Sequence, residues 1–323
     1  MQAIQITTTG GPEQLAWTTV ADPEPGPAEL LVRLDAAGVN FIDTYHRGGL
    51  YPVPLPFVPG SEGAGVIVGV GADVDAFAVG DRVAWAQAPG SYAELVRVPA
   101  ALAVAVPDGV GQDVAAAVML QGMTAHYLVH DTFPLASGHR CLIHAGAGGT
   151  GRLMIQMAKA TGAEVFTTVG SADKEELARS AGADHVIRYH DADFVAAVES
   201  VAGPRALDVV YDGVGQAVFE PSLGLLRRRG MMVTFGNASG AVEPLAPLRL
   251  MAGSLYLTRP TMVDYVSTRD ELERRSGDLF ESIAAGRLDV RIGERVALAD
   301  AAEAHRRLEG RATTGKVLLI ADS

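Results

Sequence analysis

The chain has 323 residues, with 38 acidic and 26 basic side chains, a net charge of −12 and one cysteine. A surface this acidic repels phosphodiester backbones and anionic lipid, so we expect no nucleic-acid partner and no membrane partner. A single cysteine excludes an intramolecular disulfide and a four-thiolate zinc site. The N-terminal residues lack a basic and apolar leader pattern, and no apolar run approaches the ~20 residues of a membrane helix. These features lead us to expect a cytoplasmic protein.

The first third of the chain is rich in proline and in short β-branched segments. Eleven of the 17 prolines precede residue 110, and strands are expected at 29–34, 65–70, 81–85 and 92–98. Short strands with frequent Gly and Pro between them indicate an irregular β domain or partial barrel.

The pattern changes near Gly122. From residue 140 onward, apolar runs recur with helical segments between them, at 141–145, 165–169, 185–189, 207–211, 231–235 and 255–257. Apolar strands that alternate with helices predict a parallel sheet covered on both faces, that is, a doubly wound α/β domain. The Arg227, Arg228 and Arg229 triplet before Gly230 is typical of a cationic helix C-terminus rather than of a nucleic-acid site.

The last 60 residues are less regular. The sequence at 268–271 predicts a capping box that opens a helix through Ile283. A strand at 288–292, a helix at 300–308 and a strand at Lys316–Ile320 should follow. Periodicity alone does not decide whether they extend the α/β domain or return to the first one.

The most informative segment is a glycine-rich turn after the first apolar run of the α/β region. Gly146, Gly148 and Gly151 form a G-x-G-x-x-G pattern in the predicted order strand, turn, helix. Such glycines permit a tight turn and close approach of a pyrophosphate, which the helix N-terminus then binds. The context predicts a dinucleotide site.

The end of the second strand favours NADP over NAD. In an NAD site, a carboxylate at the end of the second strand binds the ribose 2′-OH. The segment at 167–171 carries no carboxylate, and Lys174 follows it. A hydroxyl at Ser171 and a cation at Lys174 suit a 2′-phosphate, although the nearby Asp173 weighs the other way.

Several longer motifs resemble one family. The segments at 37–45, 80–83, 235–240, 254–260 and 311–315, together with the turn around Gly148, resemble the zinc-free, zeta-crystallin-like quinone oxidoreductases of the medium-chain dehydrogenase/reductase superfamily. The resemblance implies a GroES-like β-rich catalytic domain from residues 1–122 and 261–323, and an inserted Rossmann domain with a doubly wound parallel sheet from residues 123–260. It also implies NADPH in the cleft and a homodimer formed by edge pairing near residues 255–257.

Comparison with the zinc-dependent relatives implies that metal is absent. Asn40 stands where those relatives have a cysteine ligand, Ser61 replaces the histidine of a Gly-His-Glu triplet, and Leu120 replaces a further cysteine. Glu62 remains from the triplet, and we interpret it as structural.

The resemblance also assigns site residues. Those expected to contact the cofactor are Asn40, Thr124, Tyr127, Ala147, Gly148, Gly149, Thr150, Gly151, Ser171, Lys174, Tyr189, Phe235, Asn237, Ser239, Arg259 and Arg311. Those expected to line the catalytic pocket are Asn40, Asp43, Tyr45 and Tyr51. Asn40 and Tyr51 are candidates to polarise the substrate oxygen, and a proton could come from Tyr45, Tyr51 or water. Asp43 could instead cap the turn that follows it.

These features predict an NADPH-dependent quinone reductase that acts on a small-molecule quinone or enone. The first alternative is an NADPH-dependent reductase of 2-alkenals, enones or enoyl thioesters on the same scaffold. The second is a non-catalytic NADPH-binding protein. Hydride and one-electron transfer both remain open at this stage.

Overall fold

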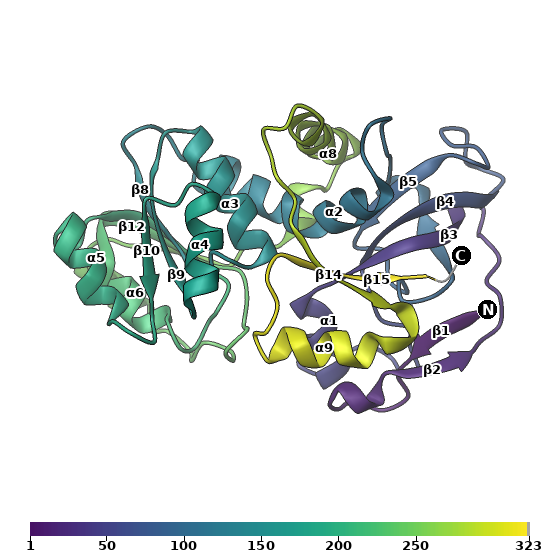
Figure 1. Ribbon diagram of the computed structural model, residues 1–323, viewed down its shortest axis with the longest axis horizontal. Coiled ribbons are helices and arrows are strands. Elements are labelled where there is room, and N and C mark those ends of the chain that lie inside the picture. The colour runs from purple at the N-terminus through teal and green to yellow at the C-terminus, as the bar shows by residue number, and fades with distance from the viewer. Residues whose placement is uncertain (322–323) are drawn as a thin grey trace. The chain divides into compact units, whose positions relative to one another are not determined.

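The computed structural model describes residues 1–321, and the chain forms two compact units. Unit 1 consists of Met1–Met123 together with the chain from Val266 onward, and unit 2 is Thr124–Tyr265. In Figure 1 the yellow C-terminal strands therefore belong with the purple and blue N-terminal strands, whereas the teal and green middle of the chain forms the other unit.

Unit 1 is built on a seven-stranded sheet with the order β14-β15-β3-β4-β5-β7, and β6 pairs with β3 outside this path. A separate antiparallel pair joins β1 to β2. The strands are β1 (Gln2–Gln5), β2 (Ala16–Thr19), β3 (Glu29–Val39), β4 (Glu62–Val70), β5 (Arg82–Ala86), β6 (Leu95–Pro99), β7 (Ala103–Ala105), β14 (Ile292–Ala297) and β15 (Lys316–Ile320). The periodicity of the last 60 residues left their place open, and strand pairing now assigns them: β15 lies antiparallel to β3.

The core of unit 1 follows from the length of β3. Its residues Leu30, Val32 and Leu34 alternate inward and are buried, as a two-residue side-chain period requires. They pack in one apolar cluster with Trp85 and Tyr92. The helices of this unit are α1 (Phe41–Gly48), the greater part of α2 (Gln112–Tyr127), α8 (Arg269–Ala284) and α9 (Ala301–Glu309), with short 3-10 segments at Pro12–Gln14, Ala100–Leu102 and Leu298–Asp300.

Unit 2 contains a six-stranded parallel sheet. Its strands are β8 (Arg140–Ile143), β9 (Glu164–Val169), β10 (His185–Arg188), β11 (Leu207–Asp212), β12 (Leu226–Thr234) and β13 (Tyr256–Thr258), arranged β10-β9-β8-β11-β12-β13. Counted along the chain this is the order 3-2-1-4-5-6, the doubly wound Rossmann arrangement, in which the strand order reverses between β8 and β11. The predicted α/β fold class is confirmed.

The helices of unit 2 connect these strands. They are α3 (Gly149–Ala160), α4 (Ala172–Ser180), α5 (Phe194–Ala202), α6 (Phe219–Leu225) and α7 (Met262–Tyr265), with a π-helical turn at Leu128–Thr132 and a 3-10 segment at Pro247–Ala252. Ser171 is the N-cap of helix α4, and its hydroxyl oxygen accepts a hydrogen bond from the backbone N–H of Lys174 at 3.4 Å. This is the capping that the serine predicts.

Several local predictions are confirmed and others are wrong. The capping box is present in unit 1, where Thr268 Oγ1 accepts from Glu271 N and Glu271 Oε2 accepts from Thr268 N, both at 3.2 Å. The arginine triplet, however, lies in β12 and not at a helix C-terminus, because α6 ends at Leu225 and Arg227 pairs with Asp208 of the neighbouring strand. The strand expected at 288–292 begins only at Ile292, and β1, β2 and β7 were not predicted.

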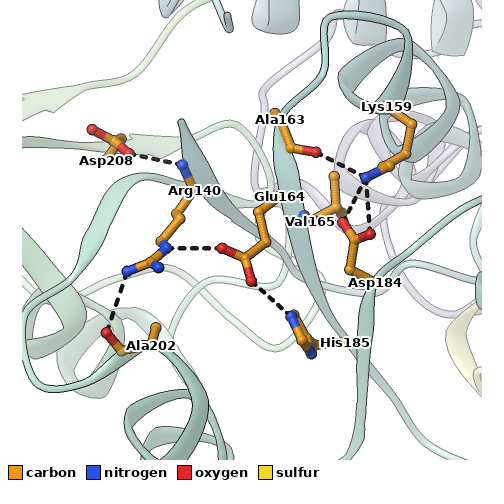
Figure 2. A network of polar contacts seen from close by, with 9 residues as sticks. All are labelled: Arg140, Lys159, Ala163, Glu164, Val165, Asp184, His185, Ala202 and Asp208. Atoms are coloured by element: carbon orange, nitrogen blue, oxygen red, sulfur yellow. Dashed lines mark hydrogen bonds and ion pairs between the residues drawn. The ribbon is translucent and has the colours of Figure 1, made fainter. Parts of the chain in front are cut away.

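The amino ends of the unit 2 strands are joined by the polar network in Figure 2. Arg140 and Glu164 open β8 and β9 and are linked by a 2.8 Å bond, and Glu164 also contacts His185 Nε2 at 2.9 Å. Lys159 pairs with Asp184 at 2.8 Å beside them. These ion pairs lie at the amino ends of the strands. Open α/β sheets bind their ligands at the opposite edge, where the carboxyl ends of the strands lie.

Candidate active site

The glycine-rich turn connects β8 to α3 at the carboxyl edge of the sheet, beside the point where the strand order reverses. Gly148 has extended backbone angles and precedes the first helical residue. Gly151 packs against the start of the turn, where a Cβ atom would collide with the backbone oxygen of Ala145, so only glycine fits. Ala147, Gly148, Gly149, Thr150 and Gly151 thus form a compact turn that leads into the helix N-terminus.

This turn leads into the N-terminus of α3. The first N–H groups of a helix have no partner within it, and the positive end of the helix dipole lies with them. Helix α3 has twelve residues and no acidic residue in its first turn. The first turn of α3 therefore presents N–H donors and no carboxylate of its own.

The residues expected around the adenosine half lie after the next two strands. Ser171 caps α4 and Lys174 stands in its first turn, after β9. Tyr189 follows β10 with 38% of its surface exposed, and its hydroxyl lies over Gly170. The three side chains therefore lie at the ends of adjacent strands, at the same edge of the sheet as the glycine turn. Asp173 is exposed in the first turn of α4.

The turns after β11 and β12 are interlocked by hydrogen bonds. Phe235 N donates to Asp212 O at 2.8 Å, and Ser239 N donates to Val214 O at 2.7 Å. The Ser239 hydroxyl is also used within this pair of turns, since it donates to Val214 O and accepts from Ala217 N. The segment that holds Phe235, Asn237 and Ser239 is therefore preorganised by its neighbour.

Asp212 anchors the first of these two turns from inside the protein. Its Oδ1 accepts from the N–H groups of Val214 at 2.7 Å and Gly215 at 2.8 Å, and the side chain is fully buried. Burial raises the pKa of Asp212 to about 6, although the two backbone donors oppose the shift. Its Oδ2 has no hydrogen-bond partner within residues 1–321.

Arg259 follows β13 and supports the second turn. Its Nη1 donates to Thr234 Oγ1 at 3.0 Å and to Gly236 O at 3.1 Å. With the Asn237 amide oriented so that donors face acceptors, its oxygen accepts from Arg259 Nη2 at 3.1 Å. Arg259 thus supports the backbone and the Asn237 side chain of this turn.

Thr124 and Tyr127 lie near the C-terminal end of α2. Tyr127 is buried, and its ring stacks on that of Tyr265 with centroids 4.3 Å apart. Thr124 is half-buried. Both residues begin unit 2, whereas the residues expected around the substrate belong to unit 1.

The residues expected around the substrate, Asn40, Asp43, Tyr45 and Tyr51, lie within and next to helix α1 of unit 1. This group is called the substrate corner. Asn40 follows β3 and precedes α1, and Asp43 accepts from the backbone N–H of Asn40 at 2.8 Å. The Tyr45 and Tyr51 rings meet edge to face with centroids 5.4 Å apart. The capping role considered for Asp43 is therefore present. Arg311 is exposed in the turn between α9 and β15 of the same unit.

The Asn40 side chain is buried and fully engaged. Its Nδ2 donates to Glu62 Oε2 at 2.8 Å and to Gly38 O at 3.3 Å. Its Oδ1 accepts from Lys316 Nζ at 2.8 Å and from Gln121 Nε2 at 3.3 Å. To polarise a substrate oxygen, the amide would have to give up one of its two donated bonds, and the longer bond to Gly38 is the weaker.

Lys316 and Gln121 were not predicted from the sequence. Lys316 opens the apolar strand β15, and a lysine at that position has the pattern of an ordinary strand end. Only its 1% exposure and its ion pair with Glu62 distinguish it. Glu62 is accordingly the buried partner of a lysine.

Within residues 1–321, no three His, Cys, Asp or Glu side chains come together in a way that could hold a metal ion. In the same part of the chain, no helix is both long enough and apolar enough to cross a membrane.

The fold and the glycine turn define a two-domain nucleotide-dependent oxidoreductase. Two family models match, an alcohol dehydrogenase GroES-like domain over residues 26–108 and a zinc-binding dehydrogenase over residues 149–277. A quinone oxidoreductase of Pseudomonas aeruginosa is 44% identical over 98% of both chains. A 2-haloacrylate reductase of Burkholderia sp. is 39% identical over 99% of both.

Solved structures agree with these relatives. The Escherichia coli quinone oxidoreductase complexed with NADPH superposes with a TM-score of 0.97 and 42% identity, over 99% of this chain and 100% of that one. The chain belongs to the quinone oxidoreductase family of the medium-chain dehydrogenase/reductase superfamily. It is an oxidoreductase.

Proposed function

We propose that this protein is an NADPH-dependent quinone reductase that passes reducing equivalents from nicotinamide to a quinone. The observation that carries the proposal is the glycine turn at the N-terminus of α3, at the reversal point of a 3-2-1-4-5-6 sheet. Relatives named quinone oxidoreductases, and a neighbour complexed with NADPH, support both the reaction and the cofactor.

The chain offers groups suited to each part of the cofactor. The N–H groups of Gly149, Thr150 and Gly151 would bind the pyrophosphate, and Ser171, Lys174 and Tyr189 would surround the adenosine with its 2′-phosphate. The turn supported by Arg259 and Asp212 would present Asn237 to the nicotinamide half. NADPH supplies the reducing equivalents when bound, and the residues around it hold and orient it.

The corner formed by Asn40, Tyr45 and Tyr51 would receive the acceptor. Two half-buried tyrosines can each donate a hydrogen bond to a quinone oxygen as it gains negative charge. Asn40 and Tyr51 are both candidates for polarising this oxygen, and the Asn40 amide would have to give up one of its present hydrogen bonds to do so.

Oxidation of NADPH, followed at the absorbance of the reduced nicotinamide, tests the proposal across a panel of quinones and enones, with NADH run in parallel. We expect quinones to have the highest kcat/KM and NADPH to be preferred over NADH. Absence of turnover with every quinone would overturn the reaction class. Stopped-flow mixing then separates the two electron-transfer routes, since one-electron transfer gives semiquinone as the first product.

A second candidate is reduction of an activated alkene, which the 39% identical 2-haloacrylate reductase favours. NADPH would then supply the hydride for the β-carbon of a conjugated carbonyl or carboxylate, and Tyr45, Tyr51 or water would supply the proton for the α-carbon. A kcat/KM for 2-haloacrylate or an enone that exceeds the value for every quinone would select this reaction.

We also propose a homodimer and a cytoplasmic location. Strand β13 is the last strand of the unit 2 sheet and pairs only with β12 within the part of the chain that the structure describes. Exposed apolar side chains accompany it: Tyr256 is 55% exposed, and Leu248 and Met251 are each 73% exposed. An open strand edge with apolar neighbours suits pairing with a second copy.

The proposed cytoplasmic location is supported by the cysteine content. The single, buried thiol of Cys141 is compatible with a reducing compartment.

A further inference from the structure

Three polar side chains from distant parts of the sequence meet in the interior of unit 1. Asn40 follows β3, Glu62 opens β4 and Lys316 opens β15, and their exposed fractions are 4%, 0% and 1%. Lys316 Nζ donates to Glu62 Oε2 and to Asn40 Oδ1. A buried ion pair of this kind is retained only where its hydrogen-bonding geometry is good.

The fold makes specific room for this cluster. Glu62 Oε1 accepts from the backbone N–H of Leu120 at 2.6 Å, so both oxygens of the carboxylate are engaged. Gly38 lies against the pair, and a Cβ atom there would collide with Glu62 Oε2 and would come within 2.7 Å of Lys316 Nζ. The missing side chain at residue 38 therefore gives the lysine its place.

The cluster permits only one orientation of the Asn40 amide. An ammonium group can only donate hydrogen bonds and an ionised carboxylate can only accept them. The amide oxygen therefore faces Lys316 and the amide nitrogen faces Glu62. Turning the amide over would set its nitrogen against the ammonium and its oxygen against the carboxylate.

Asn40 also starts the corner where the substrate is proposed to bind. Its backbone N–H is held by Asp43 Oδ2, and α1, which follows at once, carries Tyr45. A group that fixes the Asn40 side chain therefore acts on the residue from which this corner begins.

We propose that Lys316 is a positioning residue: its ammonium, neutralised by Glu62, fixes the orientation of the Asn40 amide at the substrate corner. This inference rests on the proposed function only in assigning that corner to the substrate. The orientation of the amide can be tested without any substrate.

The composition of the chain makes a direct measurement possible. The sequence has two asparagines, Asn40 and Asn237, and three lysines, Lys159, Lys174 and Lys316. Labelling with ¹⁵N-asparagine therefore gives two side-chain amide signals in the full-length protein, and an Asn237→Ser variant assigns them.

The deciding variant is the double substitution Glu62→Gln and Lys316→Met. Lys316→Met alone leaves a buried, unpaired carboxylate, so we expect a large loss of thermal stability. The double variant leaves no buried charge, and it should regain most of that loss. The carboxamide that Glu62→Gln introduces can both donate and accept, so it can serve either orientation of the Asn40 amide. Lys159→Met is the matched control, because it removes an ammonium from an ion pair in unit 2.

We expect the Asn40 amide signal of the double variant to move or split in the protein without cofactor. We also expect kcat with a quinone to fall at least tenfold. Lys159→Met should leave the signal and kcat unchanged. A folded double variant with the native Asn40 signal, or with native kcat despite a moved signal, would overturn the positioning role.

The two proposals fail separately. If the parent protein reduces no quinone, the proposed function falls, and the Asn40 signal alone then decides the positioning role of Lys316. If quinone reduction is present and the double variant retains the native Asn40 signal, only the role of Lys316 falls.

Discussion

The hydroxyl group of Tyr92 donates a hydrogen bond to Asp43 Oδ2 at 3.0 Å in the interior of unit 1. Tyr92 also lies 3.2 Å from His305 Nε2, and His305 Nδ1 lies 2.9 Å from Arg47 Nη1. Arginine can only donate, so Nδ1 accepts and the proton of His305 is on Nε2. Burial, together with the nearby positive charge of Arg47, lowers the pKa of His305 to about 3. In this series of hydrogen bonds, from Arg47 through His305 and Tyr92, each donor faces the side of Asp43. The Oδ1 atom of Asp43 has no hydrogen-bond partner within residues 1–321.

Because of Asp43, the free energy of unfolding should fall as the pH rises from about 4 to about 7. Burial raises its pKa from 3.8 to about 7, so over this range the folded state holds a proton that the unfolded state has released. At ~1.4 kcal/mol per pH unit, the loss is on the order of 4 kcal/mol. Asp43→Asn stays neutral and should remove this contribution, which urea unfolding at several pH values will measure. The exposed Asp75→Asn serves as control, and parallel pH profiles for parent and Asp43→Asn would contradict the prediction.

Tyr92→Phe should destabilise unit 1. The variant leaves the Nε2–H of His305 without its acceptor and removes one donor from Asp43, each in a site closed to water. An unsatisfied buried group of this kind costs ~1–3 kcal/mol. Denaturant unfolding without cofactor measures the loss, and Tyr189→Phe, at a position that is 38% exposed, is the matched control. Equal midpoints for the two variants would show that the hydroxyl of Tyr92 contributes nothing.

Lys174→Ala should weaken NADPH binding much more than NADH binding. A charge-assisted hydrogen bond to the 2′-phosphate contributes ~1.5–3 kcal/mol, which corresponds to a loss of about 10- to 150-fold in affinity for NADPH. NADH lacks this phosphate, so its affinity should change by less than about twofold. Fluorescence titration with both nucleotides gives the two constants, and Lys159→Ala is the control. Equal losses for the two nucleotides would place the 2′-phosphate elsewhere.

Tyr256→Glu should dissociate the proposed dimer. A carboxylate at the open edge of β13 would have to be desolvated on pairing, so the variant should sediment as a monomer at concentrations where the parent is a dimer. Val201→Glu places the same charge on another exposed apolar position, which is 53% exposed in α5, and should remain dimeric. A monomeric parent, or the same sedimentation for both variants, would exclude this edge as the interface.

Much of unit 2 was predictable because its signals are local. The turn from β8 into α3 needs glycines at fixed spacing, and buried parallel strands need continuous apolar runs. Errors arose where a partner distant in sequence decides the structure. The arginine triplet lies in β12, in the irregular stretch between the pairings of Leu226 and Met231 with β11, and Arg227 forms an ion pair with Asp208; nothing in the triplet itself indicates this.

The alternation of apolar strands with helices and the glycine turn determined the fold class, and the resemblance of longer motifs such as 37–45 and 235–240 indicated the family. Only the tertiary structure showed that Lys316 meets Glu62 and Asn40, which precede it by more than 250 positions in the chain. It alone also showed that Tyr92 and His305 converge on Asp43. The physical reason is that local spacing sets backbone conformation, whereas the partner of a buried polar group is set by how strands such as β3, β4 and β15 are paired.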